Sequence, residues 1–186
     1  MKSVLNPNIR RFSIFNRPAG ALLIGIVTVA LMPCYQVLAA DSAPQVTLNV
    51  AKTSPRHVEP LTENAVLRDY KFAWTNLAVA EESNSVASLS GLFVGDANAR
   101  LTQEIQGQQK NGMSSRYSNQ IHKVEAVFYS PEGDILELHD TAEYDFEVLD
   151  GGKSIHSEHA VVHYVVLMTP GADRWVIRHL QAVPQF

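Results

Sequence analysis

Cysteine is almost absent from the sequence, which holds a single one, Cys34, among 186 residues. One thiol excludes a disulfide framework and a zinc site built from cysteines. The rest of the composition is ordinary, with 46% hydrophobic and 18% charged residues. Such a composition excludes collagen, coiled coils, long disorder and multi-span membrane proteins. The length fits one domain with an appendage.

Acidic residues are missing from the first forty positions, which carry four bases. Residues 41–186 carry eleven bases against 19 acids, a net charge of −8. An acidic domain is a poor counterpart for phosphate backbones, so we expect no nucleic-acid partner.

Residues 1–40 have the order of a secretory signal peptide. The bases come first, residues 19–32 form an uncharged apolar run, and Ala39 and Ala40 are the expected cleavage residues. This order predicts an exported domain, periplasmic or secreted. The alternative is an uncleaved inner-membrane anchor with the domain outside the cytoplasm, because residues 19–40 carry no charge and are long enough to span a bilayer. Only the anchor would bring the chain to a membrane. Pro33 and Tyr35 interrupt the apolar run, which favours cleavage.

The rest of the chain divides into a linker and one domain. Residues 41–61 contain three prolines among small polar residues and read as a linker, although Val46, Leu48 and Val50 alternate and could add a short edge strand. Apolar residues then recur at helical spacing in three segments, from Thr62 to about residue 82, over 84–94 and over 96–110. The domain is therefore expected over residues 62–186, with its helices first.

From Arg116 the apolar period changes to two, which indicates strands. Turn signals at residues 130–133, 151–152 and 169–173 separate four such segments. The fold class predicted is α+β, with three N-terminal helices packed on a curved four-stranded antiparallel meander sheet.

The turns also predict which residues face one another. A two-residue Gly151–Gly152 turn places Tyr144 opposite His159 and Asp140 opposite His163, and the next turn places His163 opposite His179. The three-residue loop before Asp134 places Val124 opposite Asp140. Asp140, His163 and His179 would then form a row on the concave face.

A carboxylate beside an imidazole orients it and raises its basicity, so Asp140, His163 and His179 are the candidate catalytic residues. Two histidines and an aspartate could also hold a metal ion, and a buried polar row of purely structural or ligand-lining character is the third interpretation. We favour the third and assign no metal and no cofactor. The candidate ligand-binding residues around the row are Tyr144, His159, His122, Trp74, Phe128 and Trp175.

The opposite face is predicted to be apolar on the last two strands. Such an area is larger than a monomer normally exposes, so we expect a homodimer. The dimer surface is expected to be centred on Val162, Tyr164, Val166, Val176 and Leu180.

Helices followed by a long-stranded meander that ends in Trp175-Val176-Ile177 resemble the nuclear transport factor 2-like superfamily. The pair His163-Tyr164-Val165-Val166 and Asp173-Arg174-Trp175-Val176-Ile177 is similar to the closing strands of its inner-membrane translocase and plastid-division domains. The resemblance covers about residues 62–183 and implies a cone-shaped pocket between helices and sheet.

Two functions follow from this reading. The first is an exported non-catalytic binding module whose pocket binds a partner protein or a small apolar ligand. The second is a small pocket enzyme, an isomerase, lyase or hydrolase, in which Asp140 and His163 share the proton transfer. The superfamily has no common catalytic motif that could assign these roles. An enzyme would need an open cavity that reaches Asp140.

Overall fold

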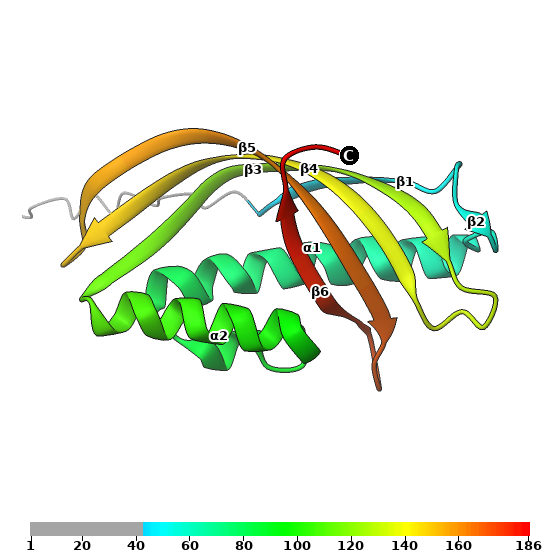
Figure 1. The fold of residues 1–186 in the computed structure, drawn as a ribbon, viewed down its shortest axis with the longest axis horizontal. Coiled ribbons are helices and arrows are strands. Elements are labelled where there is room, and N and C mark those ends of the chain that lie inside the picture. Colours follow the sequence, from blue (N-terminus) through cyan, green and yellow to red (C-terminus); the bar gives the residue numbers. More distant parts are fainter. Residues whose placement is uncertain (1–42) are drawn as a thin grey trace, which may run out of the picture. The chain divides into compact units, whose positions relative to one another are not determined.

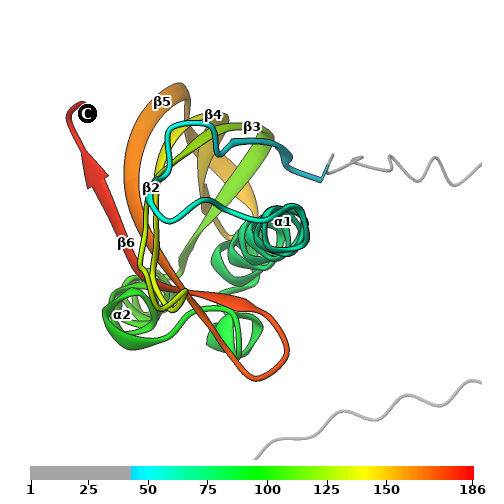
Figure 2. The same ribbon diagram turned by 90° about the vertical axis from the view of Figure 1, so that its right-hand side faces the viewer.

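The computed structural model describes residues 43–186. Two long helices lie on the concave side of a curved sheet whose central strands arch over them (Figures 1 and 2). The elements in chain order are β1 (Gln45–Asn49), β2 (Ser54–Pro55), α1 (Pro60–Ser83), the 3-10 turn η1 (Val86–Leu89), α2 (Gly95–Lys110), β3 (Met113–Tyr129), β4 (Leu136–Asp150), β5 (Lys153–Pro170) and β6 (Trp175–Val183). The predicted signal peptide or anchor over residues 1–40 lies outside the described residues. No helix within residues 43–186 is long and apolar enough to cross a membrane.

The predicted α+β class is confirmed, but the sheet has six strands and is mixed. The strand order is β1-β3-β4-β5-β6, and the four long strands form the predicted antiparallel meander. The two added strands, β1 and β2, come from the predicted linker and run parallel to β3. Val46 and Leu48 of β1 pack against the core, which explains their alternation. The short edge strand that the sequence allowed within the linker is therefore present as β1.

Two of the three predicted helices are present. The apolar face of α1 is buried as expected, at Val66, Tyr70, Ala73, Trp74 and Leu77. The predicted start at Thr62 is two residues late, because Pro60 begins the helix. Proline is favoured there, since its missing N–H would have no partner in the first turn.

The expected second helix over 84–94 is only the single turn η1. Gly91 has a φ of +70°, which reverses the chain. The backbone then leaves helical geometry because it pairs with β6: the Val94 N–H donates to the Ile177 carbonyl and the Ile177 N–H to the Leu92 carbonyl. The next helix, expected over 96–110, begins one residue earlier at Gly95, so Asp96 lies within α2 and makes no capping hydrogen bond.

Bulges in the long strands change the predicted register. Val124 pairs with Asp140, as predicted, and the Gly151–Gly152 turn pairs Asp150 with Lys153. Between Val148 and Leu149 the pairing then shifts by one residue. The shift leaves Ile155 as the extra residue of a β-bulge, and every following residue of β5 turns to the opposite face from the one predicted.

The burial of β5 shows why the shifted register is stable. It places Val166 and Met168 in the core with no exposed surface and leaves Val161 58% exposed on the convex face. Burying large apolar side chains of this kind stabilises each by about 1.5–3 kcal/mol. Pairing with β6 also differs from the prediction: His163 lies opposite Val183, and His179 opposite Leu167.

The same shift corrects the surface predicted for a homodimer. Val166, Val176 and Leu180 are buried in this chain, and Tyr164 packs against the core beside Trp74. Val166, Leu180 and Tyr164 lie on the face that the chain's own helices cover (Figure 1), whereas Val176, opposite Thr169, lies on the other face and is buried beside Gly171. These side chains therefore cannot form the expected contact with a second copy. Homodimerisation itself stays a prediction.

Candidate functional site

The predicted row of Asp140, His163 and His179 is not formed. Asp140 lies opposite Tyr164 and points into the core, whereas His163 lies on the convex face, where its Nδ1 is 3.1 Å from Thr141 Oγ1. His179 Nδ1 is 2.7 Å from the carboxylate of Asp96 on α2. The one-residue shift of β5 is the physical reason, because it moves His163 to the face opposite Asp140.

Asp140 instead contacts His122 and a tyrosine that was expected only as a core residue. His122 Nδ1 is 2.6 Å and the Tyr70 hydroxyl 2.7 Å from the same oxygen, Asp140 Oδ2. Asp140 and His122 have no exposed surface, and Tyr70 has 1%. Burial and the negative charge of Asp140 hold the pKa of Tyr70 well above its ordinary value, so its hydroxyl stays protonated and donates to Asp140.

This cluster is sealed by Trp74, whose ring lies 4.4 Å from the His122 ring. Three polar atoms in it, Trp74 Nε1, His122 Nε2 and Asp140 Oδ1, have no hydrogen-bond partner. Neither Asp140 nor His122 lines the cavities of about 530, 300, 220 and 190 Å³ within residues 43–186. The Asp–His pair can therefore hold the core together but cannot meet a substrate in this conformation.

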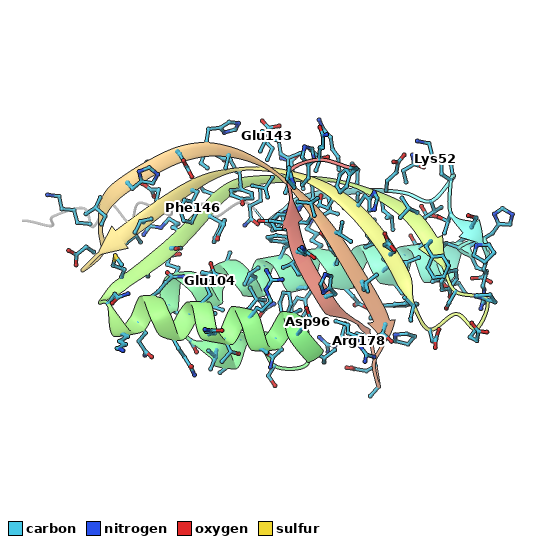
Figure 3. All side chains as sticks on the ribbon, in the orientation of Figure 1. Lys52, Asp96, Glu104, Glu143, Phe146 and Arg178 are labelled. Carbon is cyan, nitrogen blue, oxygen red and sulfur yellow. The ribbon has the colours of Figure 1, made fainter. Side chains whose placement is uncertain are left out.

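A cavity of about 190 Å³ lies on the other side of Trp74, between both helices and the concave face of the sheet. Trp74, Leu77 and Glu81 contribute from one face of α1, at the spacing of successive helical turns. Figure 3 labels Glu104 on α2, the helix that supplies the opposite wall. The lining residues are Trp74, Leu77, Glu81, Ala97, Arg100, Leu101, Glu104, Tyr117, Tyr164, Leu180 and Ala182.

Glu81 is the buried acid of this cavity, with 1% of its surface exposed. The side-chain amide N–H of Gln108 donates to Glu81 Oε2, and Ser115 Oγ donates to the side-chain oxygen Oε1 of Gln108 at 3.0 Å. Burial is the main cause that raises the pKa of Glu81 to about 7, and repulsion from Glu104 also raises it. The hydrogen bond from Gln108 lowers the pKa and offsets part of this rise. The cavity therefore holds a carboxyl group that changes its charge near neutral pH.

Tyrosine side chains form the floor of the cavity. The hydroxyls of Tyr164 and Tyr144 are 3.0 Å apart, and the Tyr117 ring meets the Tyr144 ring edge-on at 5.1 Å. Burial raises the pKa of all three, so they stay neutral at physiological pH. Tyr117 and Tyr164, the two that line the cavity, offer a ligand apolar ring surface together with hydroxyl groups.

The other predicted ligand-binding residues are dispersed. His159 is exposed on the convex face between Asp145 and Glu143. Phe128 is 37% exposed, because a bulge beside it turns it away from the core. Trp175 packs against Tyr129 near the other end of the sheet. Of the predicted set only Trp74 lines the cavity, and Tyr144 lies directly behind it.

Glu81 is a candidate ligand-binding residue that the sequence analysis does not identify, because it lies at the end of the helical segment expected to finish at about residue 82. The signal was its position, seven residues after Trp74 and four after Leu77, on the buried face of α1. Glu82, the next residue, is only half-buried and pairs with Arg116 at 2.8 Å. Within residues 43–186 no group of three or more His, Cys, Asp or Glu side chains is placed to hold a metal ion.

Comparison with known proteins finds similarity of fold and not of sequence. No protein-family model matches the chain, and no curated protein does. Among solved structures it is similar to the intermembrane-space region of the chloroplast protein ARC6, with a TM-score of 0.54 and 15% sequence identity. The match covers 69% of this chain and 98% of that one. At this identity the likeness shows a shared fold, the one expected from the plastid-division resemblance, and no shared function.

Proposed function

We propose that the chain is an exported, non-catalytic binding module of the nuclear transport factor 2-like superfamily, and that its ligand enters the 190 Å³ cavity. One observation carries the proposal: the cavity contains Glu81 and two tyrosines, whereas the Asp140–His122 pair is sealed. Ligand sites are concave, with apolar walls and a few polar groups that fix orientation. Leu77, Leu101 and Leu180 provide such walls here.

The size of the cavity restricts what it can bind. Sites for drug-sized ligands usually enclose about 300–1,000 Å³, and this one encloses about 190 Å³. A side chain inserted by a partner protein or a small molecule of similar volume fits this space. These are the two kinds of ligand, a partner protein and a small molecule, that the sequence analysis expects.

Filling the cavity should abolish binding. Ala182 lines it and is itself exposed on β6, so Ala182→Trp should occupy the space with little cost in stability. Its neighbour Gln181 is also exposed, and it points to the convex face beside His179, which makes Gln181→Trp the matched control. We expect photo-crosslinking in intact cells, or native mass spectrometry of the purified chain, to show a bound partner or ligand that only Ala182→Trp loses. Equal retention in both variants would contradict the proposal.

The enzyme alternative rests on the 2.6 Å contact between His122 and Asp140. It requires the core to open, since neither residue has exposed surface. Diethyl pyrocarbonate, which modifies accessible imidazoles, tests this directly. We expect exposed His156 and His159 to react in the native chain and His122 to stay unmodified until the chain unfolds. Reaction of His122 under native conditions would favour the enzyme.

A further inference from the structure

Part of β5 forms an open sheet edge. Pairing with β6 begins at His163, so residues 153–162 pair with β4 on one side only. Within residues 43–186 no other strand occupies the second side of this segment. The backbone N–H and C=O groups that point outward there form a template for another strand.

This segment carries the bulge at Ile155 and the charge of Glu158, but it is neither short nor covered, as protected edge strands usually are. Residues 153–159 are all exposed, and the segment contains no proline and one lysine, at its start. Ile155 is 57% and Val161 58% exposed. Natural proteins normally shorten, charge or cover such an edge. A long, open and partly apolar edge therefore indicates a partner that pairs with it.

We infer that the partner is a second copy of this chain, whose β5 pairs antiparallel with the first about a two-fold axis through Ser157. A two-fold axis perpendicular to a continuous sheet requires one residue to face its own copy. Side chains directly opposite each other in an antiparallel pair point to the same face of the sheet. The possible registers are therefore those in which one residue lies directly opposite the same residue of the second copy. The dimer would form through this edge rather than through the face expected from the sequence.

The pairing of His156 with Glu158 selects Ser157 as the centre. With Ser157 facing itself, His156 lies opposite Glu158 of the second copy, and the same pair occurs again across the axis. Centring on Glu158 would place two carboxylates together, and like charges directly opposite destabilise a sheet. Centring on His156 would place Glu158 opposite Ser154, where no imidazole meets it. Within one chain His156 and Glu158 already share a face, with Nε2 and Oε2 3.5 Å apart. Each imidazole would then lie opposite a carboxylate that can accept a hydrogen bond from its ring N–H.

Cysteine cross-linking tests the axis. Directly opposite residues have Cα atoms about 4.5–5.5 Å apart, a distance that a disulfide spans. We expect Ser157→Cys, in a full-length chain that also carries Cys34→Ser, to form a disulfide-linked dimer in intact cells under mild oxidation. Ser154→Cys is the matched control: Ser154 would face Ala160 of the second copy, and two cysteines at 154 would be about 20 Å apart.

A charge exchange tests the register. Glu158→Lys or His156→Glu alone should raise the dimer dissociation constant at least about tenfold, because each substitution acts in both symmetric pairs. The double variant should recover most of the affinity. Glu132→Lys makes the same charge change in the exposed β3–β4 loop and should have no effect. The measurement is sedimentation of the full-length chain.

Three results would overturn the inference. The first is a wild type that is monomeric at tens of micromolar. The second is cross-linking of Ser154→Cys as strong as that of Ser157→Cys, which would mean a different register or random collision. The third is a cross-linked adduct with a different protein, which would assign the edge to another partner.

Discussion

Asp140→Ala is expected to lower the free energy of unfolding by about 3–5 kcal/mol, the cost of breaking a fully buried hydrogen-bonded pair by removing one member. Asp140 Oδ2 is the acceptor for both the Tyr70 hydroxyl and the His122 ring nitrogen. Alanine leaves both donors in the core without a partner. Each unsatisfied group adds its own desolvation cost.

Two variants separate this effect from simple loss of volume. Asp140→Asn keeps a side-chain oxygen for both donors and should cost clearly less than alanine. Tyr70→Phe removes one donor and leaves Asp140 bonded to His122, so a loss of about 1–2 kcal/mol is expected. Thr141→Ala, at the next position on the other face, is the control. Urea denaturation measures all four, and a loss below about 1 kcal/mol for Asp140→Ala would contradict a structural role for the cluster.

The helices and long strands could be predicted because their signals are local. The period of three to four from Val66 to Leu77 marks α1, and the glycines at 151 and 152, both with positive φ, fix the hairpin between β4 and β5. Local turn chemistry also placed Val124 opposite Asp140 correctly. Parallel pairing of β1 with β3 was beyond reach, because it joins segments about 75 residues apart through backbone hydrogen bonds with no sequence signature.

The prediction of the Asp140–His163–His179 row was wrong because of one bulge residue in β5. Ile155 has no turn signal, and its bulge is stable only because Val166 and Met168 then pack under the helices. That gain depends on the assembled core, so the turn alone predicted the unshifted register. A one-residue shift changes the face of every later side chain, and it separated His163 from Asp140. His122 lies close to Asp140, as predicted, because the β3–β4 pairing around it has the register that the turn indicated.

Glu81→Gln is expected to stabilise the chain at alkaline pH and to leave it almost unchanged at pH 5. The pKa of Glu81 is about 7 in the folded chain, against an ordinary value of 4.5. The folded state therefore binds this proton more tightly than the unfolded chain does. The stability that results is complete below about pH 4.5 and is lost as the pH rises through 7. The difference in pKa corresponds to about 3 kcal/mol.

Glutamine imitates the protonated acid, since its side-chain oxygen can still accept the hydrogen bond from Gln108. The free energy of unfolding of the wild type should thus fall relative to Glu81→Gln by up to about 3 kcal/mol between pH 5 and pH 8. Urea denaturation at a series of pH values measures the difference in the free energy of unfolding between the two proteins. The contributions of the other titrating groups cancel in this difference.

Two further variants make this expectation specific to the cavity. Glu82→Gln, at the neighbouring position where the acid pairs with Arg116 on the surface, should show no such change between pH 5 and pH 8. Glu104→Gln removes the charge that repels Glu81 across the cavity, so it should lower the pKa of Glu81 and move the loss of stability toward lower pH. If the wild type and Glu81→Gln run parallel over the whole range, Glu81 is ionised at an ordinary pKa and the cavity does not hold a carboxyl group that titrates near neutrality.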